Sequence, residues 1–160
     1  MAGDVTLRDL TAHDLPFLFE MQRDPEGVRM AAFTVEDPSD SGAFLLKWAK
    51  LLLDETVVRK AILLDGELVG SVASFIMFGA REVSYWIARE RWGQGIATRA
   101  LSTFLSGYSV RPLHARAAKD NVGSIRVLRK CGFETVGEDR GFAHGRGAEV
   151  EEFLFRLQAP

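Results

Sequence analysis

The stretch VSYWIARERWGQGIATRAL, residues 83–101, changes character halfway along. Residues 83–88 alternate in the manner of a strand whose two faces differ. From Ile96 the apolar residues recur with a helical period, at Ile96, Ala97, Ala100, Leu101, Phe104 and Leu105. Residues 91–95, RWGQG, therefore join the end of a strand to the first turn of a helix. The first turn of a helix has backbone N–H groups without partners in the helix, and it carries the positive end of the dipole.

The corner at residues 91–95 is therefore a candidate anion site. Gly93 and Gly95 remove side chains that would keep a bulky phosphate away from the free N–H groups. We predict that the corner holds a pyrophosphate group. A bare tight turn between strand and helix is the alternative that two glycines alone leave open.

Composition narrows the class of protein. The 160 residues are 47% hydrophobic and 26% charged, with a formal net charge of -2, so we expect one globular domain over residues 1–160. Twenty basic residues are scattered among twenty-two acidic ones, which argues against a nucleic-acid partner. The single cysteine, Cys131, can form neither an internal disulfide nor a cysteine zinc site. No apolar run is long enough for a signal peptide or a membrane span, so we expect a cytoplasmic protein. We also expect no metal cofactor.

The periodicity predicts a mixed α/β domain. Asp65-Gly66 and Gly79-Ala80 are expected to join three antiparallel strands. Residues 23–40 contain two Asp-Pro dipeptides and read as a long loop with at most one helical turn. The other expected strands are 5–8, 112–118, 133–140 and 149–157, and the expected helices begin near residues 14, 44, 96 and 121. In the second helix the buried side is expected to comprise Phe44, Leu45, Trp48, Leu51 and Leu52.

Three phosphate-binding patterns can be compared with the corner. A P-loop requires lysine after its last glycine, but Ile96 follows Gly95. A dinucleotide fingerprint requires Gly or Ala where Thr98 stands, and it belongs to a parallel sheet. The third pattern, Gln/Arg-x-x-Gly-x-Gly/Ala, matches Trp92 to Ala97 at its glycine and its last residue. This third pattern is the acyl-CoA loop of the GNAT superfamily of N-acetyltransferases.

Two segments resemble the RimJ/RimL-like branch of that superfamily, which acetylates ribosomal proteins and small amines. Residues 83–101 are similar to its acyl-CoA segment, where tryptophan commonly replaces Gln or Arg. Residues 121–138, NVGSIRVLRKCGFETVGE, resemble its Asn-x-x-Ser, Lys-x-Gly-Phe and Gly-Glu run. The resemblance covers residue 63 to the C terminus well and the first sixty residues by element order. It implies a mostly antiparallel sheet of about seven strands flanked by about four helices, and acetyl transfer from acetyl-CoA to a primary amine.

The resemblance also assigns residues to the cofactor. Pyrophosphate contacts would come from the segment starting at Trp92, through the backbone N–H groups of Gly93, Gln94, Gly95, Ala97 and Thr98. The pantetheine arm would lie along residues 83–88, with an N–H of Ile87 or Ala88 on the thioester carbonyl. Asn121 matches an asparagine that contacts the arm, although a helix N-cap explains the same residue. Ser124 matches a serine near the sulfur and is a catalytic candidate, since Leu128 replaces the tyrosine that protonates the thiolate in much of the superfamily.

A base is expected because a free amine is mostly protonated at neutral pH. Glu82 is the first candidate, since it stands on the strand that the family uses for a base. Alternation places it on one strand face with Ser84 and Trp86. Glu138, Glu149 and His144 are the competitors.

The acceptor amine is open at this point. Residues 25–40 and 141–147 are expected to line its site, with Met30, Phe33 and His144 as its rim. A protein N-terminal α-amine and a small-molecule amine fit equally, as do a monomer and a homodimer. A catalytically silent acyl-CoA-binding or sensor domain is the alternative. Cys131 reads as a core residue, and Arg99, where the branch has glutamate, as part of a solvated helix face.

Overall fold

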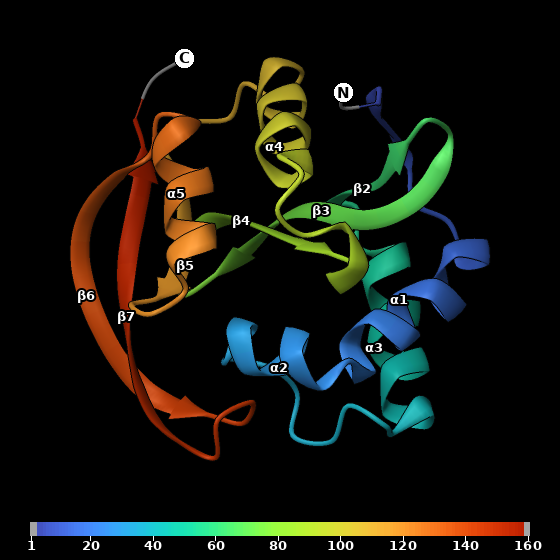
Figure 1. Ribbon diagram of the computed structural model, residues 1–160, viewed down its shortest axis with the longest axis horizontal. Coiled ribbons are helices and arrows are strands. Elements are labelled where there is room, and N and C mark those ends of the chain that lie inside the picture. Colours follow the sequence, from blue (N-terminus) through green and yellow to red (C-terminus); the bar gives the residue numbers. More distant parts are fainter. Residues whose placement is uncertain (1–2, 159–160) are drawn as a thin grey trace.

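A computed structural model describes residues 3–158 and contains one seven-stranded sheet with the order β1-β2-β3-β4-β5-β7-β6 (Figure 1). Residues 1–2 and 159–160 of the expected domain lie outside the described part. The strands are β1 Val5–Asp9, β2 Val58–Leu64, β3 Glu67–Met77, β4 Ala80–Ile87, β5 Leu113–Ala118, β6 Glu134–Ala143 and β7 Ala148–Leu157. All neighbouring strands are antiparallel except β4 and β5. The predicted fold class is confirmed.

Two tight turns join β2, β3 and β4. Asp65 and Gly66 have φ of 51° and 83°, the left-handed pair that a two-residue hairpin requires, as predicted. The second turn is formed by Phe78 and Gly79, with φ of 52° and 74°. Ala80 already pairs with Met77, so this turn lies one residue earlier than the predicted Gly79–Ala80.

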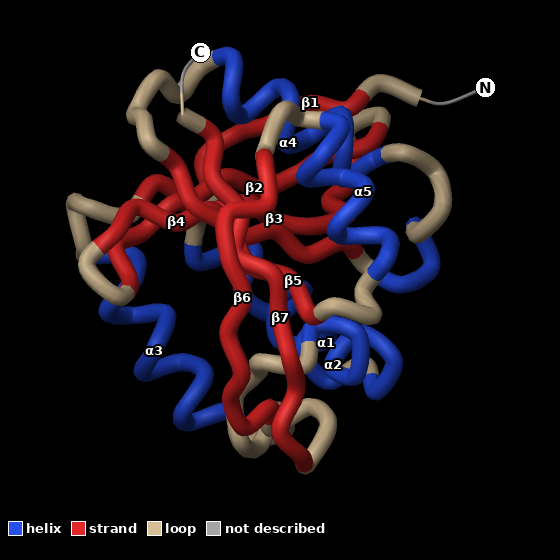
Figure 2. The backbone as a smooth tube through the Cα atoms, turned by 90° about the vertical axis from the view of Figure 1, so that its left-hand side faces the viewer, coloured by secondary structure: helices blue, strands red, loops and turns tan. Residues whose placement is uncertain are grey.

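The helices cover both faces of the sheet (Figures 1 and 2). Helices α1 Leu15–Arg23, α2 Pro25–Ala31 and α3 Ser41–Leu53 lie on one face, here called the α1–α3 face, and α4 Ile96–Ser106 and α5 Val122–Lys130 on the other, the α4–α5 face. Helix α2 corrects the predicted loop. Its sequence begins with an N-cap, Asp24, which accepts a 2.9 Å hydrogen bond from Gly27 N–H, and with proline at the first helical position, where proline is favourable.

Side-chain alternation on β4 separates two cores. Val83 and Ile87 belong to the main core beneath α4 and α5, whereas Trp86 packs on the second core with Leu18 of α1 and Phe44 of α3. Leu45 of α3 was expected in this second core, but it is 55% exposed. The apolar stripe of α3 is therefore narrower than its sequence suggests.

The β4–β5 junction is the feature that the site uses. These parallel strands share only one pair of facing residues, Glu82 and His114, and separate beyond it. The β6–β7 hairpin continues past its neighbours, and Figure 1 shows its tip below α2. Strand β6 extends to Ala143, into the predicted 141–147 loop, and β7 begins at Ala148, so that only residues 144–147 form the turn. No helix within residues 3–158 is long and apolar enough to cross a membrane.

Candidate active site

The corner between β4 and α4 has the geometry of an anion site. Gly93 and Gly95 have φ of 77° and 74°, and Gly95 is the residue that caps α4. The space beside both Cα atoms is open, so these positions need glycine for their backbone conformation rather than for lack of room. The N–H groups of residues 96–98 lie in the first turn of α4, where the helix provides no acceptor for them.

Trp92 ties this corner to the end of β4. Its indole N–H donates a 2.8 Å hydrogen bond to the carbonyl of Ile87, and its side chain remains 40% exposed. Gln94 is exposed and its amide reaches the Glu90 carbonyl at 3.4 Å, while Ala97 and Thr98 are half-buried. The expected cofactor segment is thus continuous with the strand.

The open edge of β4 carries free backbone donors. The N–H of Ala88 donates to the Val69 carbonyl at 2.9 Å on the β3 side, so it is not available to a thioester. Successive N–H groups of a strand point to opposite edges, so those of Ile87 and Tyr85 point toward β5, from which β4 has separated. Of the two expected oxyanion donors only Ile87 remains, and Tyr85 joins it.

The start of α5 carries Asn121 and Ser124. Asn121 caps the helix, since its side-chain oxygen accepts the Ser124 N–H at 3.2 Å. Its amide N–H₂ donates to the Met30 carbonyl at 3.1 Å. The Ser124 hydroxyl lies 2.8 Å from that of Tyr85, and burial raises the pKa of Tyr85 to about 12.

Glu82 lies where β4 and β5 separate. It points to the α1–α3 face and is only 5% exposed. Its contact in the described chain is an ion pair of 4.0 Å with Arg116 Nε, and no hydrogen bond supports its carboxylate. Burial raises the pKa of Glu82, while the charges of Arg116 and His114 oppose this and Glu152 adds to it.

Arg116 gathers two further carboxylates that sequence analysis missed. Glu152 of β7, 6% exposed, lies 3.1 Å from its Nη1, and Asp139 of β6 lies 3.3 Å away. Burial raises the pKa of Glu152, against the charge and hydrogen bond of Arg116. The one signal in the sequence was the strand-like alternation of residues 112–118, which predicts that the side chains of His114 and Arg116 share a face.

The competing bases lie elsewhere. Glu138 forms an ion pair with Lys119, on the α4–α5 face with Phe153. Glu149 is exposed. His144 is exposed on the hairpin turn, with its ring edge-on to Phe142 at 5.2 Å. The structure therefore brings neither carboxylate to the α1–α3 face.

The expected rim is partly assembled. Phe33 is 40% exposed and lies beside Gly141 of β6. Met30 is half-buried and its carbonyl is held by Asn121. Both residues thus lie near the β6–β7 hairpin, whose turn carries His144.

Comparison with known proteins decides the family. The family model described as "Acetyltransferase (GNAT) domain" matches residues 4–134. The chain belongs to this family.

Similar proteins agree with this GNAT assignment. "Uncharacterized N-acetyltransferase p20" of Bacillus licheniformis is 24% identical over 164 residues, covering 96% of this chain and 92% of that protein. The structure of Mycobacterium smegmatis RimJ in complex with CoA-disulfide has a TM-score of 0.81 at 23% identity, over 98% of this chain and 83% of that one. Spermidine N-acetyltransferase from Vibrio cholerae, in complex with CoA and spermine, has a TM-score of 0.75 at 21% identity, covering 95% of each chain.

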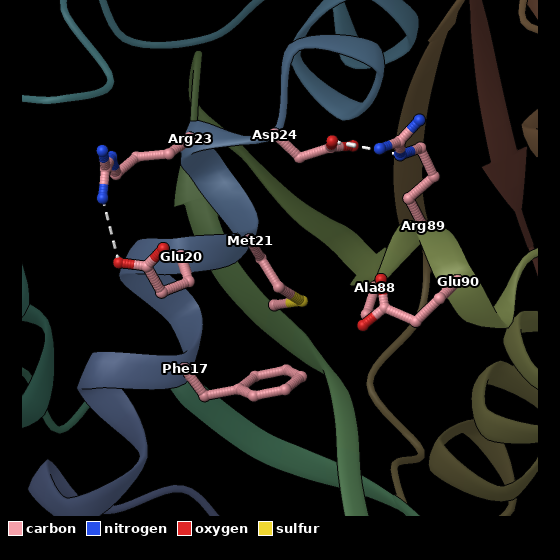
Figure 3. Close-up of a pocket in the computed structure, with 8 residues that line it drawn as sticks. All are labelled: Phe17, Glu20, Met21, Arg23, Asp24, Ala88, Arg89 and Glu90. Carbon is pink, nitrogen blue, oxygen red and sulfur yellow. Dashed lines mark hydrogen bonds and ion pairs between the residues drawn. The ribbon is translucent and has the colours of Figure 1, made fainter.

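Two pockets flank the acyl-CoA segment of this GNAT protein. One, of about 370 Å³, lies between α1 and the end of β4 (Figure 3), lined by Phe17, Glu20, Met21, Arg23, Asp24, Ala88, Arg89 and Glu90. The other, of about 430 Å³, lies between the start of β1 and α4. Arg99 lines it and donates to the carbonyls of Gly3 and Gly95, so it is a linking residue rather than part of a solvated face.

Two residues bear on protonation of the leaving thiolate. Leu128, which stands where the resemblance places a tyrosine in much of the superfamily, is 1% exposed within the main core. Cys131 is half-buried beside the same core, and burial raises the pKa of its thiol, which disfavours a nucleophilic thiolate. The hydroxyls of Tyr85 and Ser124 lie 2.8 Å apart on the same side of the sheet.

Proposed function

We propose that this GNAT protein transfers the acetyl group of acetyl-CoA to a primary amine by direct attack, with Glu82 as general base. One observation carries the proposal: β4 combines an anion-binding corner at its end, free N–H groups along its open edge, and an unsupported buried carboxylate at Glu82. Acyl transfer requires these three elements to hold the cofactor, stabilise the oxyanion and accept the proton.

The sequence of steps follows from their order along the strand. Glu82 takes a proton from the ammonium group, and the neutral nitrogen attacks the thioester carbon. The resulting oxyanion accepts hydrogen bonds from the N–H groups of Tyr85 and Ile87. Its collapse breaks the C–S bond and releases the thiolate, and the nitrogen gives up its second proton to water. Glu82 and Tyr85 are three residues apart, about 10 Å at the usual rise of a strand. The glutamate side chain and one water molecule span this distance, so proton transfer proceeds through water.

Ser124 has a supporting role in the proposed reaction. Its hydroxyl is hydrogen-bonded to Tyr85, a phenol that is protonated at physiological pH, and burial raises the pKa of Tyr85 further, to about 12. The Ser124 hydroxyl can donate a hydrogen bond to the departing thiolate, which takes its proton from water. The backbone N–H groups of Gly93, Gln94, Gly95, Ala97 and Thr98 hold the pyrophosphate in this proposal.

The acceptor is proposed to be cationic. Glu82, Asp139 and Glu152 face a single guanidinium on the α1–α3 face, that of Arg116, which leaves this cluster negative. Phe78, 76% exposed, lies over the same guanidinium with 4.6 Å between its ring centroid and Arg116 Cζ. An ammonium group beside an apolar surface suits this combination, in a small-molecule amine or a protein N terminus.

Calorimetric titration with acetyl-CoA tests the proposal first. One-to-one saturable binding is expected, followed by thiol release with an amine panel that contains a dipeptide, a polyamine and an uncharged alcohol as control. Binding without turnover of any amine would favour the silent acyl-CoA-binding domain. Failure to bind at millimolar acetyl-CoA would remove the foundation of the proposal.

A further inference from the structure

Helix α2 crosses the opening between β4 and β5. At its start, Asp24 lies 3.1 Å from Nε of Arg89, just beyond β4, and Gly27 fits against the Trp86 indole, where an added Cβ would lie 3.2 Å from the ring. At its end, Ala32 packs on Ala118 of β5. One short helix therefore contacts both of the strands that separate.

The end of α2 is fastened by donors from distant parts of the chain. The last carbonyls of a helix have no partner within it. Here the Met30 carbonyl accepts from the Asn121 amide at 3.1 Å, and the Ala32 carbonyl accepts from Gly145 N–H at 2.8 Å. The carbonyl of Arg29 accepts from Nε of Arg146. We call residues 29–33 the strap.

Arg146 is itself fixed in place. Its two terminal nitrogens each lie 2.8 Å from a carboxylate oxygen of Asp120, in a bidentate pair, and its side chain is only 16% exposed. Bidentate arginine–carboxylate pairs are strong and directional. The guanidinium therefore connects the β5–α5 corner, the β6–β7 turn and the strap.

The contact between the hairpin turn and the strap is tight. A Cβ on Gly145 would lie 2.4 Å from the Val28 carbonyl oxygen and 2.8 Å from that of Ala32. Ala32 is fully buried with φ of 63°, a backbone conformation that is unfavourable for any residue other than glycine. Strain of this kind persists only where the surroundings fix it, and it concentrates at ligand-binding elements.

We propose that Arg146 and Gly145 are positioning residues for the acceptor amine, which they act on through the strap. The strap carries Met30 and Phe33 and closes the α1–α3 face of the opening, where the amine must approach Glu82. The anion-binding corner lies at the end of β4 and receives no bond from the hairpin turn in the described chain. Loosening the strap therefore weakens use of the amine and spares acetyl-CoA. This inference rests on the proposed function.

The test compares Arg146→Met with Arg140→Met. Arg140 stands on the same hairpin, but it is 61% exposed and pairs with Glu151 at 3.4 Å, away from the strap. Misplacement of reacting groups by about 1 Å costs up to about 100-fold in rate. For Arg146→Met we expect kcat/KM for the amine to fall by about 10- to 100-fold, with a raised KM, while the Kd of acetyl-CoA by calorimetry changes less than twofold. Arg140→Met should match the wild type.

A second variant and a hydrogen-exchange measurement test the strap independently. Gly145→Ala should reproduce the amine defect, and hydrogen exchange of residues 28–33 should accelerate in both variants while that of α4 is unchanged. If Arg146→Met does not fold, Arg146→Lys, which keeps the charge near Asp120, should show a smaller amine defect. Equal losses for the amine and for acetyl-CoA, or an amine KM like that of the wild type, would overturn the inference. A wild type that binds no acetyl-CoA would instead overturn the proposed function.

Discussion

Glu82 is a carboxylate that folding removes from water without giving it a hydrogen bond. A carboxylate in such surroundings binds its proton more tightly than an exposed one, which suits a base that must work near neutral pH. The same burial makes the ionised side chain a cost to the folded state. Replacing Glu82 with glutamine is therefore expected to lower activity and to raise stability.

Glu82→Gln should lower kcat/KM for the amine by about 100-fold at pH 7, in the range ascribed to a general base. The loss should shrink at alkaline pH, where more of the amine is already neutral, and acetyl-CoA binding should be retained. The pH–rate profile of wild type and variant measures this. An unchanged profile would exclude Glu82 from the mechanism.

The same variant should be more stable than the wild type at neutral pH. Because the folded-state pKa of Glu82 is raised, the stability that its proton contributes is complete below the unfolded-state pKa, about 4.3, and is lost as pH rises through the folded-state pKa. Thermal unfolding should therefore give a higher Tm for Glu82→Gln at pH 7 and a smaller difference at pH 4. A lower Tm at pH 7 would show that the ion pair with Arg116 outweighs desolvation.

At the scale of elements, the start of α4 depends on a left-handed glycine. Gly95→Ala should cost about 1–2 kcal/mol of unfolding free energy, because φ of 74° is unfavourable for an L-residue although the space is open. It should also weaken acetyl-CoA binding by reorienting the N–H groups. Gly107→Ala, at the other end of α4 with φ of -105°, is the matched control and should be nearly neutral. Denaturant unfolding and calorimetry compare the two variants.

The hydrogen bond between Tyr85 of β4 and Ser124 of α5 leads to a second prediction at this scale. Tyr85→Phe removes the partner of the Ser124 hydroxyl, and Tyr108→Phe likewise removes the 2.9 Å partner of the buried Ser74 hydroxyl. The loss should be about 1–3 kcal/mol in Tyr108→Phe, where the fully buried Ser74 hydroxyl loses its hydrogen bond, and smaller in Tyr85→Phe, because Ser124 is half-buried. Turnover at saturating substrates should fall in Tyr85→Phe alone. Equal kcat values in the two variants would assign Tyr85 a structural role only.

Local chemistry explains how far the sequence predicts these elements. The Asp65-Gly66 hairpin and the apolar face of α4 follow from residues close together in the chain, and both predictions are confirmed. The cluster around Arg116 was missed because it joins β4, β5, β6 and β7, whose adjacency depends on sheet order rather than on any local pattern. The hydrogen bond from Arg146 to the Arg29 carbonyl of α2 joins residues 117 positions apart, so no local sequence pattern indicates it either.

At the scale of the whole molecule, a bound cofactor should raise the melting temperature. Acetyl-CoA at about 100 times its Kd adds about 2.7 kcal/mol to the folded state. For a chain of this size that corresponds to about 5–10 °C. NAD at the same concentration should leave Tm unchanged, because Thr98 and the antiparallel strands do not fit a dinucleotide fold. A larger shift with NAD would reverse the interpretation of the corner.

Because a single residue pair joins β4 to β5, the sheet has two parts, β1–β4 and β5–β7, which the chain connects through residues 88–112. The main core packs against both parts on one face of the sheet, and α2 contacts both parts on the other face. A sheet paired along its full length resists bending, but in this one β4 and β5 pair at a single position. We expect a ligand inserted at this junction to change the angle between the two parts of the sheet. Spin labels on β2 and β6 would therefore report occupancy of the site as a distance, without any turnover.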